Sequence, residues 1–264
     1  MSEIHIRGTL DGQLDLLDRQ IVSSDGLLIA NVDDLELEER ADGTLIVSGV
    51  LVGPGALGRR LGGALDFIIV NTWSRLTGRD PDDPQRIDYA HVSDIATVLT
   101  VDESREVIDI DGLETWARVR VIEALPGARD DRETSTPSTE PSRLGTGPAQ
   151  AGDRHRFSQL AGMRVVFSDG RVGDQVTDVR FGRGEPRGHL PRLVTEGLVV
   201  GRHTAGTLFG YDRRRQQGPW LIQKILRLLH RSTGHVAWSD IRSIDWDDNV
   251  ITLSTSELTR LDDL

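Results

Sequence analysis

Two Ser-Asp pairs recur in this 264-residue chain in a form that could support acid–base or nucleophilic chemistry. Ser93-Asp94 and Ser239-Asp240 are each followed by isoleucine, and a carboxylate beside a hydroxyl can act as a base or activate a nucleophile. No histidine stands at a comparable distance from both serines, and a Ser-Asp pair fits equally well in a turn that it caps. We interpret both pairs as turns, and we predict no catalytic residues and no enzymatic activity.

The glycine motif at residues 53–58 formally fits a dinucleotide-binding loop. It reads Gly-Pro-Gly-Ala-Leu-Gly and follows an apolar run. Dinucleotide binding also needs a βαβ unit and an acidic residue about 20 positions further on. Trp73-Ser74-Arg75 stands there instead, so the motif predicts a loop and no cofactor.

Histidine and acidic residues form no metal-site pattern in the sequence. The seven histidines are scattered without paired spacing, and the chain has no cysteine. Asp109-x-Asp111-Gly112 is similar to the start of a calcium loop, but the later ligand positions do not follow. Residues 80–83 and 245–248 are acidic stretches that we interpret as solvated turns. No metal is expected.

The same order of short motifs occurs twice along the chain, which indicates an internal duplication. Six blocks match in register: residues 21–26 with 165–170, 32–35 with 176–179, 45–53 with 193–201, 75–76 with 227–228, 93–95 with 239–241, and 107–110 with 250–253. Residues 126–153, rich in Pro, Thr, Ser and Gly, predict a flexible linker. We therefore expect one module over residues 1–125 and a second over residues 154–264.

Each module is predicted to be a small β-barrel with a helical insertion. Ser-Asp-Gly between apolar runs is typical of a hairpin turn. Residues 45–52 and 193–200 fit buried strands, and residues 107–110 and 250–253 fit closing strands. Five or six short strands per module favour a curled sheet or barrel. Ser254-Thr255-Ser256-Glu257 predicts the start of a last short helix.

The order of these motifs resembles the PRC-barrel family. The resemblance rests on an apolar strand, the Ser-Asp-Gly turn, a Val-x-Asp strand, an apolar strand ending in Gly, and an aromatic segment before Ser-Asp-Ile. It is best over residues 160–253, above all at residues 235–241. The fold occurs in the cytoplasmic domain of the photosynthetic reaction-centre H subunit and in the C-terminal domain of a ribosome maturation factor. The resemblance implies a docking or scaffolding module with no common catalytic residues.

Both modules contain a basic entry followed by an apolar helical segment. These insertions supply the candidate interaction surface: Arg59, Arg60 and Trp73 in the first module, and Arg213, Arg214, Arg215, Trp220, Lys224, Arg227 and Arg231 in the second. Each helix either covers its own barrel or packs on the other helix. Alternatively, one basic face meets a protein partner or an anionic membrane.

Charge is divided unequally between the modules. Residues 1–125 carry 11 basic and 24 acidic side chains, and residues 153–264 carry 17 basic and 14 acidic ones. The acidic total of −11 disfavours nucleic-acid binding. Thirty arginines against one lysine predict a GC-rich bacterial genome, such as an actinobacterial one. With no membrane-spanning run, we expect a cytoplasmic protein, with a place at the inner face of the membrane as the alternative.

These observations lead to three hypotheses about function. The first is a non-catalytic adaptor or scaffold of tandem PRC-barrel-like modules with a protein partner. The second is a peripheral membrane-surface protein that docks through its basic amphipathic helix. The third, by analogy with the maturation factor, is an RNA- or ribosome-associated factor. Two copies of one module also predict pairing, either within one chain or in a homodimer.

Overall fold

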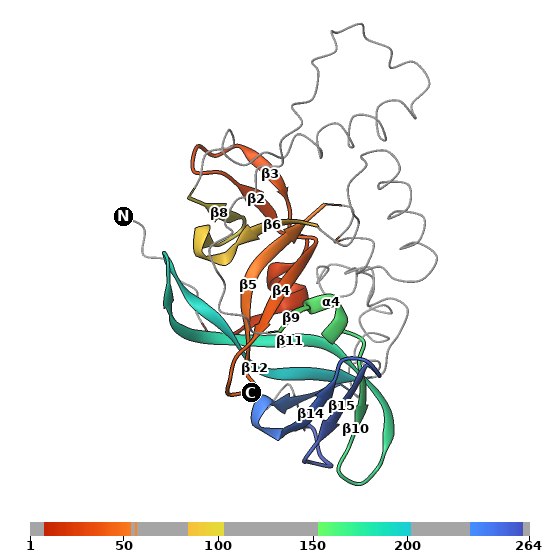
Figure 1. Ribbon diagram of the computed structural model, residues 1–264. Helices are drawn as coiled ribbons and strands as arrows, with labels where there is room; N and C mark the ends of the chain where they lie inside the picture. The colour runs from red at the N-terminus through yellow and green to blue at the C-terminus, as the bar shows by residue number, and fades with distance from the viewer. Residues whose placement is uncertain (1–7, 54–55, 57–83, 103–152, 202–232, 261–264) are drawn as a thin grey trace, which may run out of the picture.

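The predicted fold class, mainly β, is confirmed. The computed structural model describes residues 8–53, 56, 84–102, 153–201 and 233–260. We call residues 8–102 the first half and residues 153–260 the second half, in each case the described residues only. They form a 12-stranded sheet, curled into a half-barrel, and a separate 4-stranded sheet (Figure 1). The predicted helical insertions, and the predicted linker up to residue 152, lie outside the described residues.

The first half contains short strands that belong to both sheets. Its elements are β1 (Leu10–Asp11), helical turn η1 (Gly12–Leu16), β2 (Gln20–Val22), β3 (Leu28–Asn31), β4 (Asp34–Glu39), β5 (Leu45–Val52), β6 (Gln85–Asp88), helical turn η2 (Tyr89–His91), β7 (Val92–Ile95) and β8 (Leu99–Val101). Strands β3, β2, β8 and β7 make the 4-stranded sheet in that order. All eight residues of β5 are buried, as expected for an apolar run with both faces covered.

The second half lies within the larger sheet. Its elements are β9 (Arg154–Arg156), α4 (Phe157–Leu160), β10 (Arg164–Val166), β11 (Val172–Arg187), β12 (Leu190–Gly201), β13 (Gly234–Ala237), helical turn η5 (Trp238–Asp240), β14 (Ile241–Asp245), β15 (Val250–Leu253) and β16 (Thr259–Arg260). The sheet runs β14-β15-β10-β11-β12-β5-β4-β9, so its path continues from the second half into the first.

The Ser-Asp-Gly sequences form hairpin turns in both halves, as predicted. Gly26 and Gly170 have φ of 79° and 81°, a left-handed conformation that glycine adopts without strain. In the first turn the Ser23 N–H donates to Leu27 O at 2.9 Å, and in the second the Phe167 N–H donates to Arg171 O at 3.0 Å. The turns join β2 to β3 and β10 to β11.

Both halves are closed by a parallel strand, but the first closing strand is not the predicted one. In the second half β15 pairs with β10, with Val165 opposite Ile251, as expected for residues 250–253. In the first half the same role falls to β8, with Ile21 opposite Leu99. Residues 107–110, the predicted closing strand, lie outside the described residues.

The two Ser-Asp-Ile sequences do not occupy corresponding places, so that part of the predicted alignment is wrong. Ser93 and Asp94 lie in strand β7, whereas Ser239 and Asp240 lie in helical turn η5. Backbone pairing instead matches β7 with β14, since both form an antiparallel hairpin with the closing strand of their half. Three shared residues were too few to fix the register.

The predicted C-terminal helix is also wrong in its described part. The Glu257 N–H donates to Thr255 Oγ1 at 3.2 Å, which makes a local turn. Strand β16 follows it and pairs antiparallel with β13, with Gly234 opposite Arg260. The edge of β13 supplies backbone partners that a helix here would leave unpaired.

The halves join through strand pairing and share one hydrophobic core. β5 and β12 pair antiparallel where Ile46 faces Val194. Beside this pair the buried Thr195 hydroxyl donates to Leu45 O at 3.1 Å and accepts from Leu45 N at 3.2 Å. The core cluster draws buried residues from both halves. Among the described residues there is no helix with the length and apolar character needed to cross a bilayer.

Candidate functional site

The predicted interaction surface lies outside the described residues, but the strands that carry its two segments are placed. Arg59, Arg60 and Trp73 fall between β5 and β6, and Arg213, Arg214, Arg215, Trp220, Lys224, Arg227 and Arg231 fall between β12 and β13. Val52 faces Gln85 in one hairpin and Val200 faces Gly234 in the other. Each insertion therefore leaves and re-enters the sheet at neighbouring strand ends.

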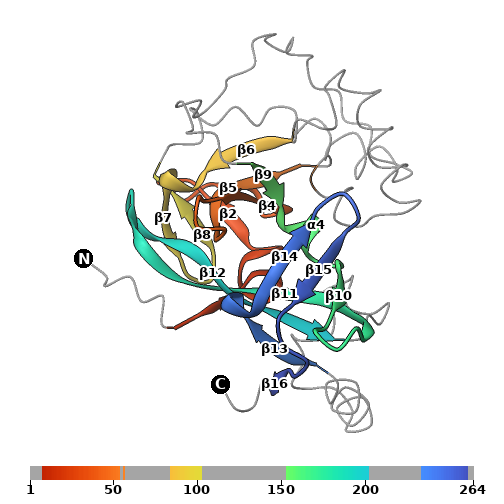
Figure 2. The same cartoon turned by 60° about the horizontal axis from the view of Figure 1, so that its bottom comes forward.

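These two exit points lie at opposite ends of the paired strands β5 and β12. β5 and β12 run antiparallel through the pair Ile46 and Val194. The chain therefore runs to Val52 and to Val200 in opposite directions along the sheet. Figure 2 shows β6 and β13, the strands that follow the insertions, on opposite sides of the view. Six residues of strand on each side of the pair place about 40 Å of strand between the two exits.

Strand exchange near the N-terminus of each half forms the second part of the contact between them. β1 pairs antiparallel with β11 of the second half, with Asp11 opposite Arg180. β9 pairs antiparallel with β4 of the first half, with Arg156 opposite Glu36. Each half therefore completes the sheet of the other.

Two buried aspartates cap the helical turns that follow the exchanged strands. The Asp34 carboxylate accepts the Ser158 N–H at 3.1 Å and the Ser158 hydroxyl at 2.5 Å, at the start of α4. The Asp178 carboxylate accepts the Gln13 N–H at 2.8 Å, in η1. Both aspartates are fully buried and also accept the N–H of the next residue in their own strand. Helix-starting N–H groups commonly take such side-chain acceptors.

Burial sets the electrostatics of Asp34. It raises the pKa of this carboxyl above its ordinary value, while the hydrogen bonds from Ser158 and Leu35 and the charge of Arg156 oppose the rise. A buried carboxylate with several donors is stable only while those donors stay in place. Asp34 therefore ties the integrity of the first half to the position of α4 in the second.

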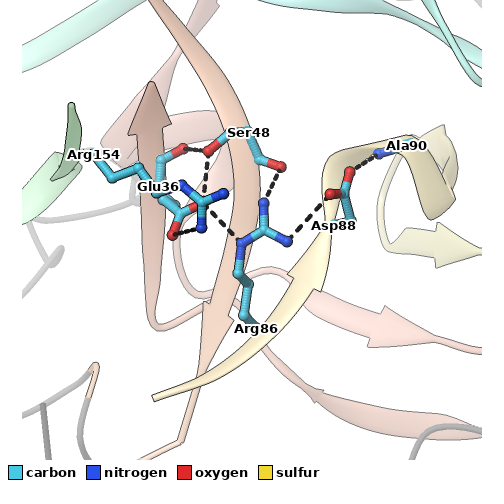
Figure 3. A network of polar contacts seen from close by, with 6 residues as sticks. All are labelled: Glu36, Ser48, Arg86, Asp88, Ala90 and Arg154. Atoms are coloured by element: carbon cyan, nitrogen blue, oxygen red, sulfur yellow. Dashed lines mark hydrogen bonds and ion pairs between the residues drawn. The ribbon is translucent and has the colours of Figure 1, made fainter. Parts of the chain in front are cut away.

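A polar network on the first half connects β4, β5, β6 and β9 (Figure 3). Arg86 Nε lies 2.7 Å from Glu36 Oε1, its second nitrogen lies 3.2 Å from Asp88 Oδ2, and its third donates to Ser48 O at 2.9 Å. Arg154 of the second half lies 3.7 Å from the other Glu36 oxygen. Burial alone would lower the pKa of Arg86, but its hydrogen bond to Glu36 and the charges of Glu36 and Asp88 together raise it. The network holds a charged arginine in a half-buried place.

Aromatic residues anchor the hairpin tips of each half on the other. The buried Tyr89 of η2 donates its hydroxyl to Pro191 O at 2.9 Å, beside the β11–β12 tip. Trp238 of η5 donates Nε1–H to Gly43 O at 3.2 Å, at the β4–β5 tip. Burial raises the pKa of Tyr89, which keeps its hydroxyl a donor. The pair repeats the reciprocal arrangement of the aspartate caps.

One carboxylate bridges two histidines at the β11–β12 tip. Asp102 Oδ1 lies 3.3 Å from His91 Nδ1, and Asp102 Oδ2 lies 3.1 Å from His189 Nε2 of the second half. Among the residues that the structure describes, no group of three or more histidine, aspartate or glutamate side chains is arranged to hold a metal ion. We assign this bridge to the contact between the halves.

Ser93 and the backbone carbonyl of Asp240, in the two Ser-Asp pairs, have structural partners. The Ser93 hydroxyl donates to Thr100 O at 3.2 Å across the β7–β8 hairpin, and Asp240 O accepts from the Ser254 N–H at 2.8 Å and its hydroxyl at 3.0 Å. The predicted turn at residues 245–248 is confirmed, because Asp245 Oδ1 accepts the N–H groups of Asp247 and Asp248.

The sequence predicted pairing of the two modules, within one chain or in a homodimer, but it did not single out the residues that make the contact. Asp34 and Asp178 were aligned as part of the duplication, yet nothing assigned them a role. Their cross-half partners are 124 and 165 residues away along the chain. The available signal was a buried acidic residue recurring inside two apolar strands, which calls for a hydrogen-bonded partner.

No protein-family model matches the chain, and no curated protein matches it.

Proposed function

We propose that this protein is a non-catalytic adaptor or scaffold with two binding segments, built from two PRC-barrel-like modules that arose by internal duplication. The observation that carries the proposal is the antiparallel pair of Ile46 and Val194. It joins the strands that lead into the two insertions and directs them to opposite ends of one sheet. A rigid β platform with a binding segment at each end suits the bridging of two partner molecules.

Support for the duplication comes from matching strand irregularities in the two halves. The β4–β5 ladder shifts register after Glu36, and the β11–β12 ladder shifts after Arg180. The β2–β3 ladder shifts after Ile21, and the β10–β11 ladder shifts after Val165. Bulges are inherited features of a fold rather than accidents. Ile46 and Val194 are also equivalent in the sequence alignment, so their pairing places a local two-fold axis between them.

The sequence of the insertions defines the partner chemistry. Both combine arginines with tryptophan and an apolar run, which favours a partner with an acidic rim around an apolar groove. Membrane docking through residues 213–231 is the alternative hypothesis. RNA binding is the third hypothesis, and it is weakened because Arg154, Arg156 and Arg180 of the basic half face acidic residues of the first half.

The experiment compares the wild-type protein with two deletion variants in crosslinking and mass spectrometry from the native cell. One variant replaces residues 53–84 by Asn-Gly, and the other replaces residues 201–233 by Asn-Gly. Each leaves the facing pair Val52–Gln85 or Val200–Gly234 closed by a two-residue turn. We expect each variant to lose a different set of crosslinked proteins while its thermal unfolding stays cooperative.

Several outcomes would contradict the proposal. Equal crosslinking by all three forms would remove the insertions as binding segments. Salt-sensitive flotation of the wild type with anionic vesicles, lost in a variant with Arg213, Arg214 and Arg215 changed to Ser, would favour the membrane hypothesis. A turnover that depends on Asp94 or Asp240 would show an enzyme.

A further inference from the structure

The strands exchanged between the halves carry opposite charges, and so do the strand edges that receive them. Asp11 on β1 faces Arg180 on β11, and Arg180 Nε lies 3.1 Å from Asp11 Oδ1. On the other side Arg154 faces Glu38 and Arg156 faces Glu36, both on β4. Every ladder pair with two charged residues at these two junctions therefore joins unlike charges.

The same two edges are geometrically interchangeable. β1 meets β11 beside its register shift at Arg180, and β9 meets β4 beside its register shift at Glu36. Both pairings are antiparallel, and both are followed by a turn that a buried aspartate of the receiving strand caps. The backbone features of the two junctions are therefore alike, and their charges are what differ.

We propose that charge decides which edge each strand joins: the edge of β4 is a docking surface for a basic strand, the edge of β11 is one for an acidic strand, and each fits the other half. If β1 joined β4 of its own half, Asp11 would face Glu36. If β9 joined β11 of its own half, Arg156 would face Arg180. Like charges directly opposite each other destabilise an antiparallel pair. The rule does not depend on what the insertions bind.

The charges at the two junctions follow the charge asymmetry between the halves. The first half is acidic and the second is mildly basic, and at the junctions Arg154 and Arg156 meet acidic β4 while Arg180 meets acidic β1. Duplicated modules otherwise tend to pair with their own kind, since an identical surface fits itself across a two-fold axis. Here such like-with-like pairing would place like charges opposite each other, which disfavours it.

The first test is charge exchange in the full-length protein. D11R and R154E each reverse one exchanged strand, and R180D and E38R reverse the facing residues. We expect D11R/R154E to raise the unfolding equilibrium constant. The quadruple variant D11R/R154E/R180D/E38R should lower that constant again, by about twofold to fivefold for each restored pair. D11R/R180D re-forms the first pair alone with its charges exchanged. Its matched control is D11R/R183D, because Arg183 lies on the same strand opposite Leu193, away from β1. A quadruple variant no more stable than the double variant would overturn the proposal.

The second test reports which edge each strand joins. The protein has no cysteine, so introduced pairs give unambiguous crosslinks. E38C/R154C reports β9 on the β4 edge, where these residues face each other. T9C/E38C reports β1 on that edge. Thr9 lies two residues before Asp11, as Arg154 lies two residues before Arg156, so Thr9 would face Glu38 if Asp11 faced Glu36. We expect efficient oxidation of the first pair only, and at least a twofold rise for T9C/E38C when D11R and R154E are added. No rise would contradict a choice made by charge.

Discussion

Arg86 on β6 and His235 on β13 stand at the same place in the two halves. Arg86 faces Leu51 on β5, and His235 faces Val199 on β12. Arg86 is satisfied by Glu36, Asp88 and Ser48 O. The Nε2 atom of His235 is buried, and among the described residues it has no hydrogen-bond partner. One backbone position therefore holds a satisfied cation in the first half and a buried, unsatisfied ring in the second.

Strands β4 and β11, which receive the exchanged strands, also differ in charge. Glu36 on β4 attracts Arg86 and Arg154. Arg180 on β11 instead pairs with Asp11. Burial lowers the pKa of the nearby His235, and the charge of Arg180 lowers it further. The acidic position on β4 thus has an arginine near it on β6, and the basic position on β11 has a histidine near it on β13. Strand pairing therefore constrains the backbone of both halves alike, while the side chains of each half determine whether its buried polar groups find partners.

The largest expected effect is from the buried cap that crosses between the halves. We expect Asp34→Ala to lower the free energy of unfolding by about 3 kcal/mol, because two Ser158 donors and the Leu35 N–H lose their acceptor. Urea unfolding of the full-length protein measures it. Asp42→Ala, which removes an exposed turn carboxylate bonded to Thr44, is the control and should change little. Equal effects of the two substitutions would contradict a cross-half role for Asp34.

The equivalent glycines Gly49 and Gly197 differ in the space beside them. A Cβ at Gly197 would lie 2.3 Å from His235 Nε2 and 2.4 Å from Val236 O, whereas at Gly49 its nearest neighbours are Arg86 Nε at 2.9 Å and Ile87 O at 3.1 Å. We expect Gly197→Ala to destabilise the protein by about 2 kcal/mol. Gly49→Ala should cost less, since the Arg86 side chain can shift. Thermal unfolding of both variants decides, and a larger effect at Gly49 would reverse the comparison.

Local features of the fold could be predicted from the sequence. The turns at Gly26 and Gly170 follow from Ser-Asp-Gly, and the buried strands β5 and β12 follow from continuous apolar runs. These signals act over a few residues. The closing strand of the first half was misplaced, because Leu99–Val101 has only three residues and its parallel partner lies nearly 80 positions earlier.

The contact between the halves could not be predicted in the same way. β1 and β9 have two and three residues, which is too short for any periodic pattern to stand out. Their pairing comes from edges formed by strands far away in the chain. The charge difference between the halves was visible in the sequence, but its use at Asp11 and Arg180 needed the register of the ladder.

His235 and Arg86 should differ in how they make the free energy of unfolding depend on pH. Burial, with the charge of Arg180, lowers the pKa of His235, so below the ordinary histidine pKa of about 6.5 the unfolded chain binds a proton that the folded protein does not. We expect the free energy of unfolding to fall as pH drops through that value. His235→Gln should flatten the slope between pH values of about 7.5 and 5.5 in urea unfolding. Arg86→Gln, the matched control, should lower stability without changing the slope.

The smallest effect concerns the aromatic anchors at the hairpin tips. Tyr89→Phe deletes a buried hydroxyl that donates to Pro191 O, and we expect a loss of about 1 kcal/mol. Trp238→Phe deletes the bond to Gly43 O, which lies at a solvent-exposed tip where water can replace the lost donor. Its effect should therefore be smaller. Thermal unfolding gives the order of the two, and amide hydrogen exchange at residues 40–44 and 188–191 tells whether each tip loosens on its own. If both tips loosened in both variants, the anchors would act through the whole junction rather than separately.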